Sequence, residues 1–212
     1  MLNEKDLLNI KEAIVGLNLS ADDSYSRVGD LIYESSNPIF HSSEIHQGVT
    51  KRCISFPQYK VVVKYSRYGY TEAEEEIQVY AEAEKIGIAF LFPETHLLVV
   101  HNGITFVIQK MVDYSCGNIP RVHRKTYENI SRTVKCTYVK KMQKQFDKAG
   151  RCCHRTIDDT WAKCVISLYG KNVAKTLSNF VVAQGINDLH CDNIGFINCK
   201  PVILDFSGYK GN

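Results

Sequence analysis

The pattern of apolar residues changes once along this 212-residue chain, and that change limits the folds it can adopt. Up to about residue 110, short apolar runs alternate with turn residues, whereas beyond Asp113 apolar residues recur at helical spacing. Strands followed by helices are typical of an α+β fold or of two lobes. We therefore predict one part over residues 1–111, with an N-terminal helix, an antiparallel sheet and one further helix, and a helical part over residues 112–212.

Local patterns predict the elements of the first part. A first amphipathic helix places four apolar residues on one face, namely Leu7, Ile10, Ile14 and Leu17. Residues 28–110 are then expected to alternate strands and turns. Two strands are predicted near 52–56 and 60–65, a helix over 72–87, and a hairpin over 96–112. The Asn102-Gly103 pair favours the positive φ angles that a tight hairpin turn requires.

The second part is predicted to contain two long helices and a short hairpin. Helical spacing extends over roughly 122–148 and again over 158–183. The hairpin that follows has its turn near Asn198. No apolar run reaches the roughly 18–20 residues that span a bilayer, and charges interrupt the N-terminal apolar pattern. We therefore expect a cytoplasmic protein with neither a membrane segment nor a signal peptide.

The eight cysteines and the basic residues each allow more than one interpretation. Without an export signal, reduced thiols are favoured over a disulfide framework. Zinc binding through Cys152, Cys153 and His154 is disfavoured, because the chain has no Cys-x-x-Cys pair. Residues 121–155 hold eleven Lys or Arg and two acids, a net charge of about +9. That segment is either a solvated helical face or a surface for phosphate, nucleic acid or an acidic protein.

Polar residues cluster in the stretch "INDLHCDNIG", between the end of an apolar-faced helix and a buried strand pair. Phosphoryl transfer needs a carboxylate near the attacking hydroxyl, ligands for Mg²⁺ and a cation on the nucleotide phosphates. Asp188 and Asn193 are five residues apart across a loop. Asp205 follows after a hairpin that can return its carboxylate to Asn193. Carboxylate and amide oxygens suit Mg²⁺, so this stretch is a candidate site for phosphate chemistry.

The required cation is expected on a strand in the first part. Lys64 ends the apolar run "VVVK", where an ammonium without a partner is costly. A carboxylate of the following helix should pair with it. Glu76 shares a helix face with apolar residues and is the first choice, while Glu72 and Glu75 remain alternatives.

The strand lysine, the helix glutamate, "D-L-H-x-x-N" and "D-F-S-G" together resemble the protein-kinase-like superfamily. The resemblance spans about residues 45–208 and implies a two-lobed fold that binds ATP and Mg²⁺. It implies a catalytic role for Asp188, an ion pair of Lys64 with Glu76, and metal binding by Asn193 and Asp205. It also places nucleotide contacts at Gly48 and at the backbone of Lys110 and Val112, with Gln109 guarding the back pocket.

Several positions depart from the common protein-kinase pattern. Ile186 and Asn187 replace the usual His-Arg, which implies no control by a phosphorylated loop. The "D-L-H" variant is similar to aminoglycoside and choline kinases. The glycine-rich loop is thin, with Gly48 beside Thr50 and Lys51. The chain ends four residues after Gly208, and this layout, with its truncated helical lobe, resembles the minimal Ser/Thr kinases of bacteriophages and bacterial effectors.

The sequence thus predicts a minimal protein Ser/Thr kinase that acts on a host or partner protein, in the host cytoplasm if it is a phage or effector protein. The basic segment 121–155 would dock an acidic protein substrate, and nucleic acid is a less favoured partner. Three other readings stay open: a small-molecule phosphotransferase, a non-catalytic pseudokinase that binds a partner, and an enzyme that transfers AMP instead of phosphate.

Overall fold

The computed structural model describes residues 3–20, 25–47, 51–66, 70–150 and 157–207. The predictions for Gly48, Thr50 and Gly208, and for Cys152, Cys153 and His154, lie outside these ranges. The described part combines helices with antiparallel strands, so the α+β class is confirmed. None of its helices is both long enough and apolar enough to span a bilayer. The six cysteines that it includes form no disulfide.

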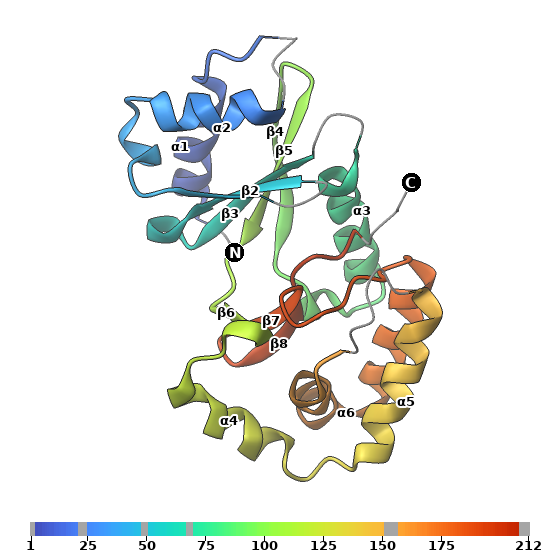
Figure 1. Cartoon of the computed structure of the whole chain (residues 1–212). Helices are drawn as coiled ribbons and strands as arrows, with labels where there is room; N and C mark the ends of the chain where they lie inside the picture. Colours follow the sequence, from blue (N-terminus) through green and yellow to red (C-terminus); the bar gives the residue numbers. More distant parts are fainter. Residues whose placement is uncertain (1–2, 21–24, 48–50, 67–69, 151–156, 208–212) are drawn as a thin grey trace. The chain divides into compact units, whose positions relative to one another are not determined.

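The chain forms two compact units (Figure 1). The first contains Met1–Gln78 and Glu94–Met111, and the second contains Val79–Pro93 and Val112–Asn212. The predicted division at 111/112 had placed residues 79–93 in the first part. Apolar side chains of this segment, such as Leu91 and Phe92, belong to the hydrophobic core of the second unit. Helix α3, Glu72–Lys85, therefore begins in one unit and ends in the other.

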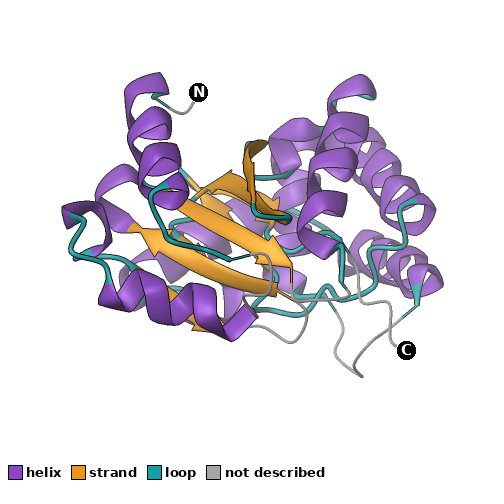
Figure 2. Ribbon diagram, turned by 90° about the horizontal axis from the view of Figure 1, so that it is seen from above, coloured by secondary structure: helices purple, strands orange, loops and turns teal. Residues whose placement is uncertain are grey.

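The first unit contains a five-stranded antiparallel sheet with the order β1-β2-β3-β5-β4. Figure 2 draws the strands in orange. Its strands are β1 Glu44–Gln47, β2 Lys51–Phe56, β3 Val61–Ser66, β4 Thr95–His101 and β5 Ile104–Lys110. The predicted strands near 52–56 and 60–65 and the predicted hairpin are confirmed. Asn102 and Gly103 have φ angles of 47° and 78°, as a type I′ turn requires.

Two helices complete the first unit, α1 Glu4–Val15 and α2 Tyr25–Glu34. The first was predicted, and its Ile10 and Ile14 are fully buried. The second was missed, because residues 28–34 were expected to form strands and turns. Val28 and Ile32, four residues apart, are both buried and define the apolar face of α2.

The second unit is mainly helical, with a small sheet of order β6-β7-β8. Its elements are α4 Arg121–Ser131, α5 Cys136–Phe146, α6 Asp159–Ala183, β6 Tyr114–Ser115, β7 Ile194–Ile197 and β8 Lys200–Ile203. Short 3₁₀ turns in the two units occur at Pro38–Phe40, Pro57–Tyr59, Ala89–Leu91, Cys116–Asn118 and Asp147–Ala149.

The prediction of one helix over 122–148 is wrong, because this stretch forms α4 and α5 with a break between them. In a continuous helix at about 100° per residue, Tyr127 and Val139 would point about 120° apart. Both side chains are nevertheless buried in the same core. The break after Ser131 lets each helix turn its own apolar face inward.

The predicted helix over 158–183 is present as α6, but Gly170 interrupts it with φ 82° and ψ 169°. Residues that have a Cβ almost never adopt this backbone conformation. In Figure 1 the part of α6 after Gly170 runs alongside α5. The sequence pattern gave the length of α6 but not this change of direction.

The β7–β8 hairpin is fixed in place by side chains from other parts of the second unit. Its turn lies at Asn198 and Cys199, both at positive φ, near the predicted position. The Asn198 N–H donates to Asp113 Oδ2 at 2.6 Å. The indole Nε1 of fully buried Trp161 lies 3.2 Å from each of two hairpin carbonyl oxygens, those of Gly195 and Val202. These contacts set the position of the polar residues on either side of the hairpin.

Candidate functional site

In the first unit, a buried ion pair joins β3 to α3. The Lys64 ammonium lies 2.8 Å from Glu76 Oε2 and 3.1 Å from Glu76 Oε1. Glu76 is 0% exposed and Lys64 is 5% exposed. The predicted pairing of Lys64 with Glu76 is therefore confirmed as a contact. A pair held this far from water loses its hydration, so its geometry must be retained for the unit to remain stable.

A second lysine contacts the same carboxylate, which the sequence reasoning missed. Lys51 of β2 donates to Glu76 Oε1 at 2.5 Å and is 5% exposed. Cys53 is opposite Lys64 in the sheet register, and Lys51 is two residues from Cys53. Lys51 and Lys64 therefore project from the same face of the sheet. Two ammonium groups therefore contact one buried carboxylate.

Neutral groups complete the surroundings of Glu76. Gln109 Nε2 of β5 donates to Glu76 Oε2 at 3.3 Å and to Thr95 Oγ1 at 3.1 Å. Gln109 and Thr95 are 3% and 2% exposed. Gln109, the residue predicted to guard the back pocket, therefore lies beside Glu76.

The two alternative partners of Lys64 have other surroundings. Glu72 is buried, and its Oε2 has no hydrogen-bond partner among the described residues. Glu75 Oε1 accepts from Thr71 Oγ1 at 3.0 Å. Glu76 is therefore the carboxylate that holds the lysines, as the position of apolar residues on the helix had suggested.

The predicted adenine contacts lie at the end of β5 and just beyond it. The Lys110 N–H donates to the Glu94 carbonyl at 2.9 Å, so only its carbonyl remains to bind a base edge. The Met111 N–H donates to the Lys60 carbonyl at 2.8 Å. Val112 begins the second unit, and the roles given to Lys110 and Val112 stay predictions.

In the second unit, Asn193 holds together the loop that contains Asp188. Asn193 Nδ2 donates to the Asp188 carbonyl at 2.8 Å, and its backbone N–H donates to the His190 carbonyl at 3.0 Å. The Asn193 carbonyl accepts the Leu204 N–H at 2.8 Å. Asp205 directly follows Leu204, so this contact joins the loop to the stretch that ends β8.

The hairpin register explains how the predicted metal ligands come together. Ile194 is opposite Ile203, which brings the neighbouring Asn193 and Asp205 to the same end of the β7–β8 pair. Because Asn193 Nδ2 is used by the Asp188 carbonyl, its Oδ1 is the atom that can bind a cation. An amide oxygen and a carboxylate are hard ligands, so the two residues fit Mg²⁺.

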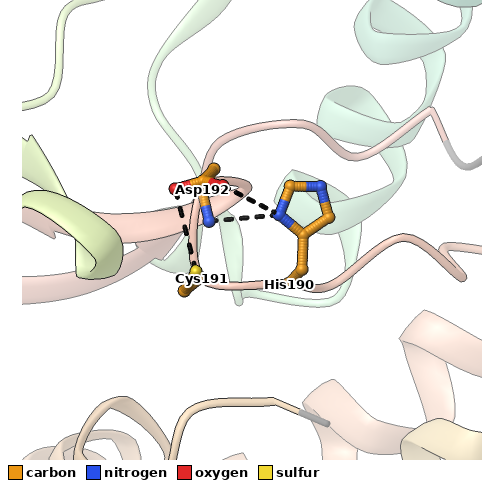
Figure 3. Close-up of side chains that lie close together, drawn as sticks. All are labelled: His190, Cys191 and Asp192. Carbon is orange, nitrogen blue, oxygen red and sulfur yellow. Dashed lines mark hydrogen bonds and ion pairs between the residues drawn. The ribbon is translucent and has the colours of Figure 1, made fainter. Parts of the chain in front are cut away.

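His190 lies beside the side chain of Asp188. It also contacts the backbone of Asp192, as Figure 3 shows. His190 Nδ1 accepts the Asp192 N–H at 3.2 Å, and its Nε2 lies 3.6 Å from Asp188 Oδ1. When the ring is neutral, this hydrogen bond leaves the proton on Nε2, facing Asp188. The ring thus lies beside the carboxylate predicted to be catalytic.

His190, Cys191 and Asp192 place one nitrogen, one sulfur and one oxygen within 4.8 Å of one another. Mixed donors of this kind do not suit Mg²⁺, which prefers oxygen. The Nδ1 lone pair is also already used by the Asp192 N–H. We interpret the cluster as part of the loop structure and assign it no metal.

A glycine outside the predicted site supports this loop. The Gly117 N–H donates to the Cys191 carbonyl at 3.1 Å. A Cβ at Gly117 would lie only 2.4 Å from Asp192 Oδ1. No local pattern around "SCGN" indicates this contact, because it depends on a residue some 75 positions later.

Buried thiols and phenols of the second unit do not supply a nucleophile. Burial raises the pKa of Cys164 to about 12, and burial also raises the pKa of Cys116. The pKa of Tyr127 is raised by burial and by its hydrogen bond with Tyr114. All three groups are therefore neutral near pH 7.

Comparisons with known proteins leave the function to be inferred from these residues. No protein-family model matches the sequence, and no curated protein matches it either. One similar solved structure is an aminoglycoside phosphotransferase from Alicyclobacillus acidocaldarius subsp. acidocaldarius DSM 446. It shares 13% sequence identity and a TM-score of 0.34 over 77% of this chain and 61% of that chain. The chain thus spans about three fifths of that protein.

Proposed function

We propose that the protein is a Mg²⁺-dependent enzyme that transfers the γ-phosphoryl group of ATP to Ser or Thr of another protein. The observation that carries this proposal is the buried group of Lys51, Glu76 and Lys64, in which one carboxylate holds two ammonium groups in place. In phosphoryl transfer, an ion pair of a strand lysine with a helix glutamate positions that lysine on the nucleotide phosphates. Nucleotide phosphates are the anions that the remaining residues also fit.

Each residue of the proposed site has a defined task. Lys64, held by Glu76, would contact the nucleotide phosphates, and Gly48, Lys110 and Val112 would contact other parts of ATP. Asn193 and Asp205 would hold Mg²⁺, which neutralises phosphate charge when bound. Asp188 would accept the proton of the substrate hydroxyl. The hydroxyl oxygen then bonds to the γ-phosphorus as the bond to the β-phosphate oxygen breaks, and ADP leaves.

The protein substrate is proposed to be acidic and to bind the basic segment 121–155. Lys140, Lys141 and Lys144 of α5 are exposed in that segment. Their attraction for an acidic surface would act over about 8–10 Å at moderate salt. Nucleic acid is a less favoured partner of the same segment.

A small-molecule phosphotransferase is the second candidate. The observation that favours it is the "D-L-H" sequence, in which His190 lies beside Asp188. A non-catalytic binding protein and an AMP transferase remain as outcomes of the experiment that follows.

Incubation with γ-labelled ATP, Mg²⁺ and a cell lysate tests the proposal, with Asp205→Ala as the control. We expect label on proteins, a mass increase of one phosphate on Ser or Thr, and no label with the variant. Label only in the small-molecule fraction would favour the second candidate. A mass increase of one AMP would show nucleotidyl transfer, and no transfer at all would contradict the proposal.

A further inference from the structure

Two adjoining cavities lie between α5 and α6 in the second unit. The smaller has a volume of about 280 Å³ and the larger about 850 Å³. Tyr138, Ile166 and Lys171 line both, so the two share part of their walls. We call the two cavities together the α5–α6 groove. It belongs to neither of the residue clusters proposed above for ATP and Mg²⁺.

The floor of the groove is apolar in its smaller part. Met142, Ile166 and Ala174 line it there, next to the ring of Tyr138. These three side chains are 4–8% exposed and form part of the core of the second unit. A volume of about 280 Å³ is at the lower end of the size of small-ligand pockets and accepts one bulky apolar side chain.

The rim of the groove is strongly basic. Lys141 and Lys175 line the smaller cavity, Lys135 lines the larger, and Lys171 lines both. Among the described residues that line the two cavities, none is Asp or Glu. The Lys171 ammonium lies 3.9 Å from the centre of the Tyr138 ring, which holds it at the junction of the cavities. Four cations without a lining acid favour an anionic occupant.

The backbone adds to this positive potential. Gly170 interrupts α6, so a new helix begins at Lys171 on the wall of the larger cavity. The start of a helix carries a partial positive charge, and lysines there are normally unfavourable. Lys171 and Lys175 lie in its first two turns, where an anion would offset both charges.

From these observations we propose that the α5–α6 groove binds a short acidic segment of a partner protein, with one apolar side chain in the smaller cavity. From Lys135, the residue that precedes α5, to Gln145, this wall of the groove extends about 15 Å, which an extended peptide covers with about five residues. This inference rests on the proposed function for its role, since the partner would be the protein substrate. It refines the proposed role of the basic segment by naming Lys141 as its contact residue, and it adds Lys171 and Lys175 of α6, which lie outside that segment.

The chain offers a matched control on the same helix. Lys140 and Lys144 of α5 are exposed, as is Lys141, but they line neither cavity. Lys141→Glu with Lys175→Glu changes the net charge by the same amount as Lys140→Glu with Lys144→Glu. Only the first double variant changes the groove, so any difference between them separates a specific site from general attraction.

Binding can be measured without ATP by fluorescence anisotropy of a labelled peptide. The probe is an eight-residue peptide with one phenylalanine among glutamates, and a second probe has serine in place of the phenylalanine. We expect Lys141→Glu/Lys175→Glu to weaken binding of the first probe about tenfold or more, and Lys140→Glu/Lys144→Glu less than about threefold. The serine probe should bind about tenfold more weakly to the unaltered protein.

A third variant tests the apolar cavity while keeping every charge. Ala174→Leu adds methyl groups to the floor of the smaller cavity and should remove the preference for phenylalanine over serine. Circular dichroism would confirm that each variant is folded. Equal losses in both double variants, or no preference for phenylalanine, would overturn the proposal. So would a single-stranded oligonucleotide that displaces the peptide and binds more tightly through the same lysines.

The same measurements separate this inference from the proposed function. Peptide binding that follows the expected pattern, without any phosphoryl transfer, would support the groove as a binding site and refute the proposed enzymatic function. If the double variant Lys141→Glu/Lys175→Glu transfers phosphate to a lysate protein as fast as the unaltered protein does, the proposed enzymatic function stands. The groove is then refuted as the docking site of the substrate.

Discussion

Neutralising Glu76 should destabilise the protein more than any other single carboxylate change in the first unit. Glu76→Gln keeps the size of the side chain but leaves the ammonium groups of Lys51 and Lys64 without their shared counterion. Both lysines are about 5% exposed, so water does not replace the lost charge. Removing one partner of a buried ion pair costs about 3–5 kcal/mol.

Calorimetric melting of the variant gives a direct measurement. For a chain of this size, about 1 kcal/mol corresponds to roughly 2–4 °C, so we expect Tm to fall by about 6–20 °C. Glu72→Gln is the matched control, because Glu72 is also buried in α3 but its Oε2 has no hydrogen-bond partner among the described residues. Its Tm should change by less than about 3 °C, the equivalent of roughly 1 kcal/mol.

A double variant tests whether Lys51 belongs to the same group. Adding Lys51→Met to Glu76→Gln removes one of the two ammonium groups that lose the Glu76 carboxylate and should restore part of the lost stability. The reasoning is refuted if Glu76→Gln costs less than about 1 kcal/mol, or if Glu72→Gln costs as much.

Three further predictions concern other parts of the chain. Phosphatase-treated protein should be as active as untreated protein, because the resemblance to protein kinases aligns Asn187 with the arginine that reads a phosphorylated loop; a large loss on dephosphorylation would contradict this. Because burial raises the pKa of Cys164 to about 12, iodoacetamide at pH 8 should label exposed Cys136 and Cys199 but not Cys164. The pKa of the Cys164 thiol is about 8.5 in the unfolded chain, so its contribution to stability should decrease as pH rises above about 8.5. Mass spectrometry of the labelled protein checks which thiols react, and melting curves at pH 8 and 10 check the loss of stability. Trp161→Phe should lower the free energy of unfolding by about 1–3 kcal/mol, because the carbonyls of Gly195 and Val202 lose the indole N–H as their donor. An unchanged melting temperature by circular dichroism would refute this.

Local sequence patterns predicted those features that depend on neighbouring residues. Alternating apolar residues and Asn102-Gly103 gave the hairpin of β4 and β5, and helical spacing around Ile10 and Ile14 gave α1. The pairing of Lys64 with Glu76 could also be predicted. A charge in an apolar strand requires a counterion, and only one face of α3 was directed toward the sheet.

Features that depend on distant contacts could not be predicted in this way. Lys51 reaches Glu76 because β2 and β3 pair in one register, which the local pattern does not reveal. The break between α4 and α5 arises because Tyr127 and Val139 must enter one core. Gly117 lies against Asp192 through tertiary packing alone.

The kinetics of a double variant test most directly whether Lys64 and Asp205 take part in one reaction. The rate of ATP-dependent phosphate transfer would be compared for Lys64→Met, Asp205→Asn and the variant with both changes, with folding confirmed by circular dichroism. Residues that act as one catalytic unit are strongly non-additive. We expect each single change to reduce kcat/KM by on the order of 10³-fold, and the double change to reduce it little further. Retained transfer in either single variant, or losses that multiply in the double variant, would contradict a shared catalytic role.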